Sequence, residues 1–403
     1  RDTAGRVGLM LTLPPLSLYI HVPWCVRKCP YCDFNSHENE SGELPEDDYI
    51  TALLDDLRHD LKYVQRREIQ SIFIGGGTPS LLSAKAYARL FEGLQQHLTF
   101  ASDIEITLEA NPGTAEREKF ADYFLAGINR LSLGVQSFSP EQLKNLGRIH
   151  DSQDAERAIE YARNAGFKRL NIDIMYGLQQ QAPEQALADL ERAIGFDPEH
   201  ISWYQLTIEP NTAFYKQPPP LPAEDTLIDM QDAGLALLEG AGYQRYEISA
   251  FAKQGEQARH NINYWQFGDY LGIGAGAHAK LTQPHRQRVL RLRKRKQPGH
   301  YLAAAKHSLA QESTNLANRY PYLADASPIE AEELPLEFLL NALRLREGFT
   351  KTQFEQRTGL PYTVIADKVS VLQKQGLMDS SDEQVTTTIR GYHFLNSVLG
   401  YFV

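Results

Sequence analysis

The stretch Cys25-Val26-Arg27-Lys28-Cys29-Pro30-Tyr31-Cys32 contains all three cysteines of the 403-residue chain. Spacings of four and three residues let one tight loop direct three thiolates at one point. This arrangement suits a cubane iron–sulfur cluster held by cysteine thiolates. Three ligands for four irons leave one iron open to a non-protein ligand. The spacing therefore predicts a 4Fe–4S cluster on Cys25, Cys29 and Cys32.

The cysteine group is less compatible with a zinc site, a disulfide or an ordinary core. A structural zinc site usually has four protein ligands, and the nearest candidates for a fourth are Asp33, His37 and His21. A disulfide would leave one of the three crowded cysteines unpaired. Three unrelated core cysteines would not be expected to gather in one short stretch of a chain this long. The cluster remains the favoured interpretation.

The composition is that of an ordinary soluble protein with more than one domain. Single cores rarely grow beyond about 250–300 residues, so a chain of 403 residues is expected to divide. Hydrophobic residues make up 42%, the mean hydropathy is −0.41, and no apolar run approaches the roughly 20 residues that span a bilayer. The net charge of −10 argues against general nucleic-acid binding, which depends on neutralising phosphates. We therefore expect no nucleic-acid partner and no stable membrane insertion.

The start of the chain lacks the features of a secretory signal. Arg1 and Arg6 accompany only a short apolar patch at residues 7–11, with no convincing signal core or cleavage pattern. A thiolate cluster is sensitive to air, and no cysteine elsewhere could form a disulfide. Both observations predict a cytoplasmic location.

Short apolar runs alternate with amphipathic segments from residue 17 to about residue 250. In residues 45–64, for example, Tyr49, Leu53 and Leu57 recur at helical spacing. Strands separated by crossover helices form a parallel sheet, so about six such units predict an α/β protein with an open or complete barrel. The expected strands are 18–22, 71–74, 104–108, 130–135, 170–175, 201–207 and 246–249.

A helix-rich unit follows the barrel. Helical patterns at 334–346, 351–358 and 361–375, two short β-like runs and a terminal helix have the order of a winged helix. DNA binding is the weaker interpretation, because the third helix carries only Lys368 and Lys374 against Asp367. A packing or lid domain is expected instead. The predicted divisions are a flexible N-terminus at 1–16, the barrel with an extension at 17–308, a linker at 309–330, and a winged-helix-like C-terminal domain at 331–403.

Polar residues follow the ends of successive expected strands, where barrel chemistry is located. Residues 75–77 are consecutive glycines, which let a ligand approach the backbone closely. A carboxylate inside an apolar strand is costly unless it is paired or bound. Asp173 therefore indicates either a ligand contact or a salt bridge with Arg148 or Arg130. Ligand contacts are favoured because three successive strands carry polar residues at comparable depth, namely Glu109, Gln136 and Asp173.

The spacing C-x3-C-x2-C, with the aromatic Tyr31 before the last cysteine, resembles the signature of the radical SAM superfamily. This resemblance implies a partial (β/α)6 barrel and S-adenosylmethionine chelated at the open iron, where an electron passed through the cluster cleaves the sulfonium. The chain is most similar to the coproporphyrinogen-oxidase-like branch, in which an arginine at the position of Arg148 suits the methionine carboxylate. The residues that match S-adenosylmethionine contacts are Tyr19, Gly76, Gly77, Thr78, Glu109, Gln136, Arg148 and Asp173.

Two sequence features distinguish the oxidases of this branch from its haem chaperones. The anaerobic coproporphyrinogen III oxidases have a further cysteine where this chain has Phe34, and they have a longer N-terminal extension. The segment His260-Asn261-Ile262-Asn263-Tyr264-Trp265 resembles the haem-binding motif of the HemW-type haem chaperones. The resemblance implies that His260 ligates haem iron or shapes the pocket, with Tyr264 and Trp265 as its walls. The alternative is that His260 is a loop residue hydrogen-bonded within the protein and binds no ligand. His21 is the competing candidate for the haem ligand.

Two functions therefore stay open. The first is a haem chaperone that delivers haem to apo-haemoproteins such as respiratory enzymes, with a cluster that supports dimerisation or transfer. The second is a radical SAM oxidoreductase, an oxygen-independent coproporphyrinogen III oxidase. Phe34 and the short N-terminus favour the first. The expected partners are haem, an acceptor apo-haemoprotein, an electron donor and a second copy of the chain. The basic run at 286–296 is expected to be a solvated strand or loop, with haem propionates as its functional alternative.

Overall fold

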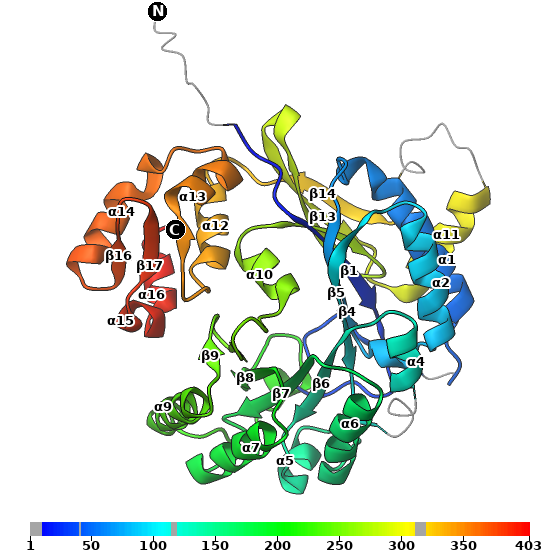
Figure 1. Ribbon diagram of the computed structural model, residues 1–403, viewed down its shortest axis with the longest axis horizontal. Helices are drawn as coiled ribbons and strands as arrows, with labels where there is room; N and C mark the ends of the chain where they lie inside the picture. The colour runs from blue at the N-terminus through cyan, green and yellow to red at the C-terminus, as the bar shows by residue number, and fades with distance from the viewer. Residues whose placement is uncertain (1–9, 40–41, 114–118, 311–319) are drawn as a thin grey trace, which may run out of the picture.

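The computed structural model describes residues 10–39, 42–113, 119–310 and 320–403 (Figure 1). Most of the N-terminus that was expected to be flexible, residues 1–9, lies outside the described part. So do residues 311–319 of the expected linker. Leu11 is buried, and Leu16 already begins the first strand, so the ordered chain starts before the expected boundary.

Within the described residues, twelve strands form one sheet in the order β14-β13-β12-β11-β1-β4-β5-β6-β7-β8-β10-β9. Neighbouring strands from β1 to β8 pair in parallel. This confirms the predicted partial (β/α)6 barrel, whose strands are nearly continuous apolar runs because helices cover them. The parallel strands are β1 (Leu16–Val22), β4 (Ile69–Gly76), β5 (Phe100–Ala110), β6 (Arg130–Gln136), β7 (Leu170–Tyr176) and β8 (His200–Gln205).

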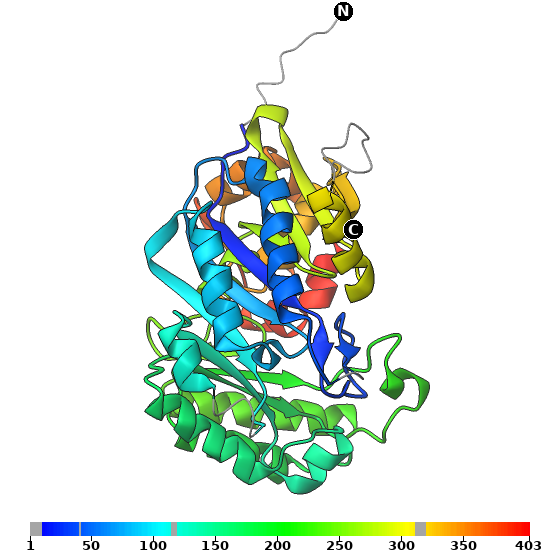
Figure 2. The same cartoon turned by 90° about the vertical axis from the view of Figure 1, so that its right-hand side faces the viewer.

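The helices between these strands cover the outside of the sheet. Figure 2 shows α1 (Glu46–Asp60) and α2 (Ala84–Gln95) side by side across it. Helix α1 buries Tyr49, Leu53 and Leu57, the residues that recur at helical spacing in the sequence. The other elements of this part are η1 (Leu61–Tyr63), η2 (Pro79–Leu81), α4 (Phe120–Leu125), α5 (Pro140–Asn145), α6 (Ser152–Asn164), α7 (Pro183–Gly195), α8 (Ala213–Lys216) and α9 (Glu224–Gly240).

The prediction of a seventh strand at residues 246–249 is wrong. These residues form a turn between β9 (Gln244–Arg245) and β10 (Ala250–Ala252), which runs antiparallel to β8. The Arg245 guanidinium donates to carbonyl oxygens of the turn, including that of Glu247 at 3.2 Å. The carbonyl oxygens of Glu247 and Ile248, which a strand would pair with a neighbouring strand, are therefore bound by a side chain instead.

An extension continues the sheet beyond β1. After α10 (Arg259–Trp265), β11 (Asp269–Ile273) pairs in parallel with β1. The antiparallel strands β12 (His278–Gln283), β13 (Arg288–Lys294) and β14 (Leu323–Pro328) follow, with η3 (Pro284–Arg286) and α11 (Pro298–Ala310) between them. Strand β14 lies inside the segment expected to be a linker. Its backbone pairs with the edge of β13, a long-range contact that the local composition does not indicate.

The basic run of residues 286–296 is only partly the solvated strand that was expected. It forms β13, in which Arg293 is half exposed and ion-pairs with Asp325 at 3.5 Å. Lys294 is buried instead, and its ammonium contacts the carboxylates of Asp56 and Asp60 on α1. The expectation is wrong for this residue, because a pair of buried acids compensates its charge.

The C-terminal domain has the expected winged-helix order. Three helices, α12 (Leu334–Ala342), α13 (Lys351–Thr358) and α14 (Thr363–Lys374), accompany a small sheet of β15 (Phe349–Thr350), β17 (Gln384–Thr387) and β16 (Met378–Ser380). Two short helices, α15 (Ile389–His393) and α16 (Leu395–Gly400), end the domain. Figure 1 shows α10 between this domain, in orange and red, and the barrel sheet.

Candidate functional site

The cysteine loop leaves the carboxyl end of β1. Its ends are joined where β2 (Trp24–Cys25) pairs in parallel with β3 (His37–Glu38). Inside the loop, the backbone N–H of Cys32 donates to the carbonyl oxygen of Cys29 at 3.1 Å. All three cysteines are free thiols, Cys25 being buried and the other two half-buried. The loop holds them at the mouth of the barrel.

The surroundings of the thiols fit an iron–sulfur cluster. Burial raises the pKa of the Cys25 and Cys32 thiols, so a metal must displace their protons to bind. No group of three or more His, Cys, Asp or Glu side chains in the described chain lies close enough to hold one metal ion. A four-iron cluster does not require such a group, because each thiolate binds a different iron. Three cysteine thiols in one loop therefore suit a cluster of this kind.

A cavity of about 420 Å³ brings the cysteines together with the strand ends. Its volume is within the range of small-molecule sites. Tyr19 is the one predicted S-adenosylmethionine contact that does not line this cavity; it lines a neighbouring one, where its hydroxyl lies 2.8 Å from His21 Nδ1. The predicted contacts that line this cavity with the three cysteines are Gly76, Gly77, Thr78, Glu109, Gln136, Arg148 and Asp173.

The glycines after β4 allow close approach of the backbone. A Cβ atom on Gly77 would lie 2.5 Å from the carbonyl oxygen of Trp24, so a side chain there would displace the cysteine loop. Gly76 has a φ of +117°, and its N–H donates to the Glu109 carboxylate at 3.2 Å. The glycines thus hold the cysteine loop against the cavity.

Two half-buried carboxylates, Glu109 and Asp173, face this cavity. Burial, together with the nearby charge of Asp173, raises the pKa of Glu109 to about 8. Burial also raises the pKa of Asp173, although Asn171 and Ser132 donate hydrogen bonds to it at 2.7 and 3.1 Å. A cationic ligand would favour the ionised form of both groups. The sulfonium and ammonium of S-adenosylmethionine fit this requirement.

The salt bridges considered for Asp173 are not formed. Arg130 pairs instead with Glu105, at 3.6 Å. Arg148 donates to the side chain of Asn111 and to the carbonyl oxygen of Gly134, both at 2.7 Å, and its Nη1 lies 3.6 Å from Cys29 Sγ. The buried Nε of Arg148 has no hydrogen-bond partner. Arg148 therefore retains a donor beside the cysteines.

Gln136 is held at the end of β6 in a strained conformation, with a φ of +70°. Tyr204 on β8 donates its hydroxyl to Gln136 Oε1 at 2.5 Å. Tyr204 lines the cavity, as do Asn111 and Ser132. The sequence analysis missed these residues, although Asn111 and Tyr204 also lie at strand ends, where the search for polar residues could have found them.

A second cavity, of about 760 Å³, adjoins the first and shares with it Phe34, Ser36, Gly76 and Glu109. Its size and aromatic walls suit a flat apolar ligand. Basic side chains and histidines also line it. The cavity therefore suits an apolar ligand that carries acidic groups. The aromatic residues are Tyr19, Phe34, Phe73, Tyr264, Trp265, Phe267 and Tyr270, the cations are Lys28, Lys280, Arg291 and Lys296, and the histidines are His21, His37 and His278.

The histidines of the second cavity favour the neutral form. Burial lowers the pKa of His21 to about 4, and its Nε2 lies 2.9 Å from the carbonyl oxygen of Asn35. Burial lowers the pKa of His278 as well, and the charges of Arg293 and Lys296 add to this effect. A neutral imidazole can ligate iron. The sequence analysis missed His278, since only the folding of β12 against β11 brings it to the cavity.

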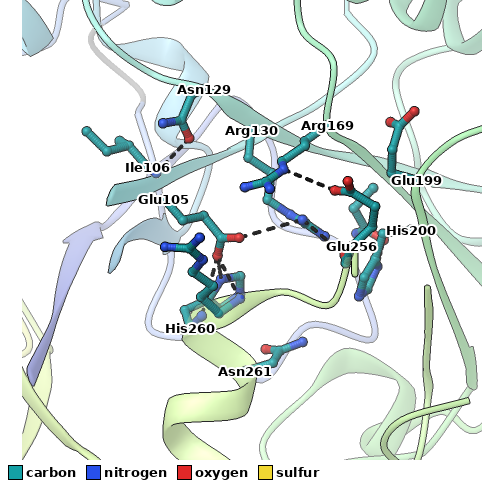
Figure 3. Close-up of polar contacts among 12 residues, drawn as sticks. Glu105, Ile106, Asn129, Arg130, Arg169, Glu199, His200, Glu256, His260 and Asn261 are labelled. Carbon is teal, nitrogen blue, oxygen red and sulfur yellow. Dashed lines mark hydrogen bonds and ion pairs between the residues drawn. The ribbon is translucent and has the colours of Figure 1, made fainter. Parts of the chain in front are cut away.

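His260 does not line the second cavity, whereas Phe73, against which it packs, does. Its ring stacks on Phe73 with centroids 4.2 Å apart, and its Nδ1 lies 3.2 Å from Glu105 Oε1. Figure 3 shows the Glu105 carboxylate between His260 and Arg130. Of the predicted haem-motif residues, the aromatic Tyr264 and Trp265 reach the cavity surface, whereas the histidine supports it.

Comparisons with known proteins match nearly the whole chain. Residues 19–193 match the radical SAM superfamily and residues 329–394 the HemN C-terminal domain. The "Heme chaperone HemW" of Escherichia coli K12 is 49% identical over 394 residues, covering 98% of this chain and 100% of that protein. The "Heme chaperone HemW" of Bacillus subtilis is 33% identical, covering 96% and 99%. The solved coproporphyrinogen III oxidase (HemN) of Escherichia coli has a TM-score of 0.78 at 23% identity, covering 97% of this chain and 90% of that one, and shows the fold alone.

Proposed function

This chain belongs to the family of heme chaperones named HemW, within the radical SAM superfamily, and from that premise we propose that it binds haem and delivers it to apo-haemoproteins. The proposed acceptors are haem-dependent respiratory enzymes. In this proposal a 4Fe–4S cluster is held by Cys25, Cys29 and Cys32, and S-adenosylmethionine occupies the adjoining cavity. The chemistry that a cluster supplies in this superfamily is one-electron reduction.

The observation that carries the haem proposal is the second cavity. Haem is a flat apolar macrocycle with acidic propionates, and the cavity combines aromatic walls with cations. Lys280 and Arg291 already pair with Asp269 and Glu337. We therefore assign the propionates to Lys28 and Lys296, which line the same cavity and are exposed.

The cysteine-lined cavity supports a cation-binding role for its two acids and an anion-binding role for Arg148. Glu109 and Asp173 would compensate the positive groups of S-adenosylmethionine, while Arg148 would hold its carboxylate. Gly76 and Gly77 would let the methionine part lie against the backbone. Gln136 and Thr78 complete the polar lining of this cavity.

His260 is proposed to shape the haem cavity through its stacking on Phe73, with Tyr264 and Trp265 as walls. The three histidines that line the cavity are better placed for axial ligation than His260 is. Of these, His278 is assigned as the ligand, because both ring nitrogens of His21 and the Nε2 of His37 are already hydrogen-bonded. Axial ligation by His260 itself is the alternative that the experiment below tests.

Haem titration followed by Soret absorbance distinguishes these roles. The reconstituted wild type should bind haem, and His278→Ala should alter the Soret maximum because the axial ligand changes. His260→Ala should weaken binding without changing the maximum, since only the wall is disturbed. His21→Ala serves as the competing ligand variant. A changed maximum in His260→Ala alone would make His260 the ligand, and absence of haem binding by the wild type would refute the proposed function.

Oxygen-independent coproporphyrinogen III oxidase activity is the alternative function. Phe34 occupies the position of the oxidases' further cysteine and is 60% exposed at the junction of the two cavities. An apolar ring there cannot take the place of a thiol. Anaerobic incubation of the reconstituted protein with coproporphyrinogen III, S-adenosylmethionine and a reductant should therefore yield no decarboxylated product. Formation of that product would favour the oxidase.

The working environment and partners form part of the same proposal. Free thiols that hold a cluster need a reducing compartment, which the cytoplasm provides. The proposed partners are an electron donor to the cluster and a second copy of the chain in a homodimer. In the described part of the chain, no helix combines the length and apolar character needed to cross a membrane.

A further inference from the structure

A chain of hydrogen-bonded side chains runs through the interior from the cysteine-lined cavity to α10, which helps to wall the second cavity. It begins at Asp173, in the cysteine-lined cavity, where Asn171 Nδ2 donates to Asp173 Oδ1 at 2.7 Å. Asn171 Oδ1 lies 2.6 Å from Nδ1 of His200 on the neighbouring strand. His200 Nε2 lies 2.8 Å from the Tyr246 hydroxyl, and Asn261 Nδ2 donates to that hydroxyl at 3.1 Å. The chain therefore ends on α10, the helix that carries Tyr264 and Trp265.

Every hydrogen bond in this chain has the same direction. A carboxylate only accepts, so the Asn171 amide must turn its nitrogen to Asp173 and its oxygen to His200. His200 Nδ1 must then carry the proton. Burial lowers the pKa of His200 well below its usual value, so its Nε2 is unprotonated and accepts from Tyr246. Tyr246 in turn accepts from Asn261, so all donors point toward Asp173.

A second branch converges on the same carboxylate. Asn171 Nδ2 also donates to Ser132 Oγ at 2.8 Å, and Ser132 Oγ donates to Asp173 Oδ2 at 3.1 Å. The residues that make up this hydrogen-bonded chain are buried or half-buried. Hydrogen bonds aligned in one direction polarise one another, most effectively away from water. A change at Asp173 is therefore transmitted toward α10 more strongly than isolated bonds would allow.

We propose that Asn171, His200 and Tyr246 are positioning residues that couple ligand binding at Asp173 to the α10 wall of the haem cavity. The coupling rests on the proposed function, because it links the S-adenosylmethionine site to the haem site. A cationic ligand beside Asp173 stabilises its carboxylate form, which is a stronger acceptor for Asn171 and Ser132. The strengthened chain then holds Asn261, and with it α10, more firmly. S-adenosylmethionine should consequently tighten haem binding, and haem should tighten S-adenosylmethionine binding by the same factor.

Tyr246→Phe tests the coupling with little disturbance of packing, because it removes one hydroxyl from the middle of the chain. Tyr243→Phe is the matched control. Tyr243 lies three positions away and is also buried, but its hydroxyl donates to the carbonyl oxygen of Pro198 at 2.6 Å and takes no part in the chain. Asn261→Ala is a second variant that removes only the outer end and leaves the bonds between Asp173 and Tyr246 intact.

The first measurement does not involve haem. Hydrogen exchange of the α10 amides is followed in the cluster-loaded protein with and without saturating S-adenosylmethionine. Exchange should slow on addition of the ligand in wild type and Tyr243→Phe. It should be unchanged in Tyr246→Phe and Asn261→Ala, although calorimetry still shows ligand binding. An equal slowing in Tyr246→Phe and Tyr243→Phe, or no slowing in the wild type, would overturn the proposal.

The second measurement is the haem dissociation constant with and without S-adenosylmethionine. The ligand should lower it about 5-fold or more in wild type and Tyr243→Phe, a typical size for coupled sites, and leave it unchanged in Tyr246→Phe. An unchanged constant in a wild type that binds both ligands would overturn the coupling and leave the haem proposal standing. A wild type that binds no haem at all would refute the haem proposal, while the exchange measurement still decides whether the chain connects Asp173 to α10.

Discussion

Replacing Lys294 with methionine should destabilise the barrel by several kcal/mol. The Lys294 ammonium contacts Asp56 and lies 2.6 Å from an Asp60 carboxylate oxygen, and all three side chains are at most 1% exposed. Methionine fills a similar volume but leaves two buried carboxylates without their cation. Removing one partner of a buried ion pair costs about 3–5 kcal/mol, because the remaining charge is desolvated and unpaired.

Arg293→Met is the matched control on the same strand. Arg293 precedes Lys294 and points to the opposite side of β13, where it pairs with Asp325 at 3.5 Å. Its side chain is 50% exposed and that of Asp325 is 44% exposed. A surface ion pair contributes about 0–1 kcal/mol, so this variant should remain close to the wild type in stability.

The loss in Lys294→Met should also depend on pH. Burial raises the pKa of Asp56 to about 6 even with Lys294 present, and removal of the ammonium raises it further. When the pKa of a carboxyl group is higher in the folded state than in the unfolded state, the group stabilises the fold at pH values below its unfolded-state pKa. That contribution is lost as the pH rises through the folded-state pKa. The deficit of Lys294→Met should therefore be smallest at about pH 4 and should grow toward about pH 8.

Urea unfolding of both variants and the wild type, followed by tryptophan fluorescence, measures these differences. Trp24 and Trp203 are buried in the barrel and report its unfolding. The reasoning would be refuted if Lys294→Met lost no more stability than Arg293→Met. It would also be refuted by a Lys294→Met deficit that shrinks as the pH rises.

Three further predictions concern the cofactors. Cys29→Ala should abolish the thiolate-to-iron absorption of the reconstituted protein, and four irons retained by a variant lacking all three cysteines would contradict the assignment. Asp173→Ala should weaken S-adenosylmethionine binding in calorimetry while the iron content is unchanged, because a carboxylate facing the cation is lost; unaltered affinity would remove Asp173 from the site. Affinity for S-adenosylmethionine should rise with pH up to about 8, since Glu109 has its pKa raised to about 8 and must ionise to face a cation. Glu109→Gln should flatten this profile, and a wild-type affinity that falls over the same range would be inconsistent with the role of Glu109.

Local patterns were sufficient for much of the fold and of the cysteine-lined site. A parallel strand covered on its outer face by helices is a run of apolar residues, so six strands could be recognised from their composition. Ligand contacts of a barrel follow the ends of its strands, so Glu109, Gln136 and Asp173 could be placed in one site before any contact was known. The prediction of a seventh strand was wrong because residues 246–249 form a turn, in which the Arg245 side chain binds the carbonyl oxygens of Glu247 and Ile248.

The second cavity depended on tertiary structure to a much greater degree. The segment from His260 to Trp265 was recognisable, but only packing against β4 and β5 places His260 behind Phe73 and against Glu105. Residues such as His278 reach the cavity through pairings between strands of the extension, which periodicity does not specify. The same holds for the chain from Asp173 to Asn261, whose members come from separate strands, a turn and a helix.

Information local to the amino-acid sequence was enough to predict the grouping of the three cysteines, the parallel barrel and the polar strand ends, because each follows from spacing, periodicity or position along a strand. The pairing of buried charges depended instead on the tertiary structure. Lys294 shows the reason: its neighbours in sequence predict a solvated strand, whereas its partners Asp56 and Asp60 lie on α1, far away along the chain. Periodicity reports which side chains are buried, but the partner that compensates a buried polar group is selected by three-dimensional packing.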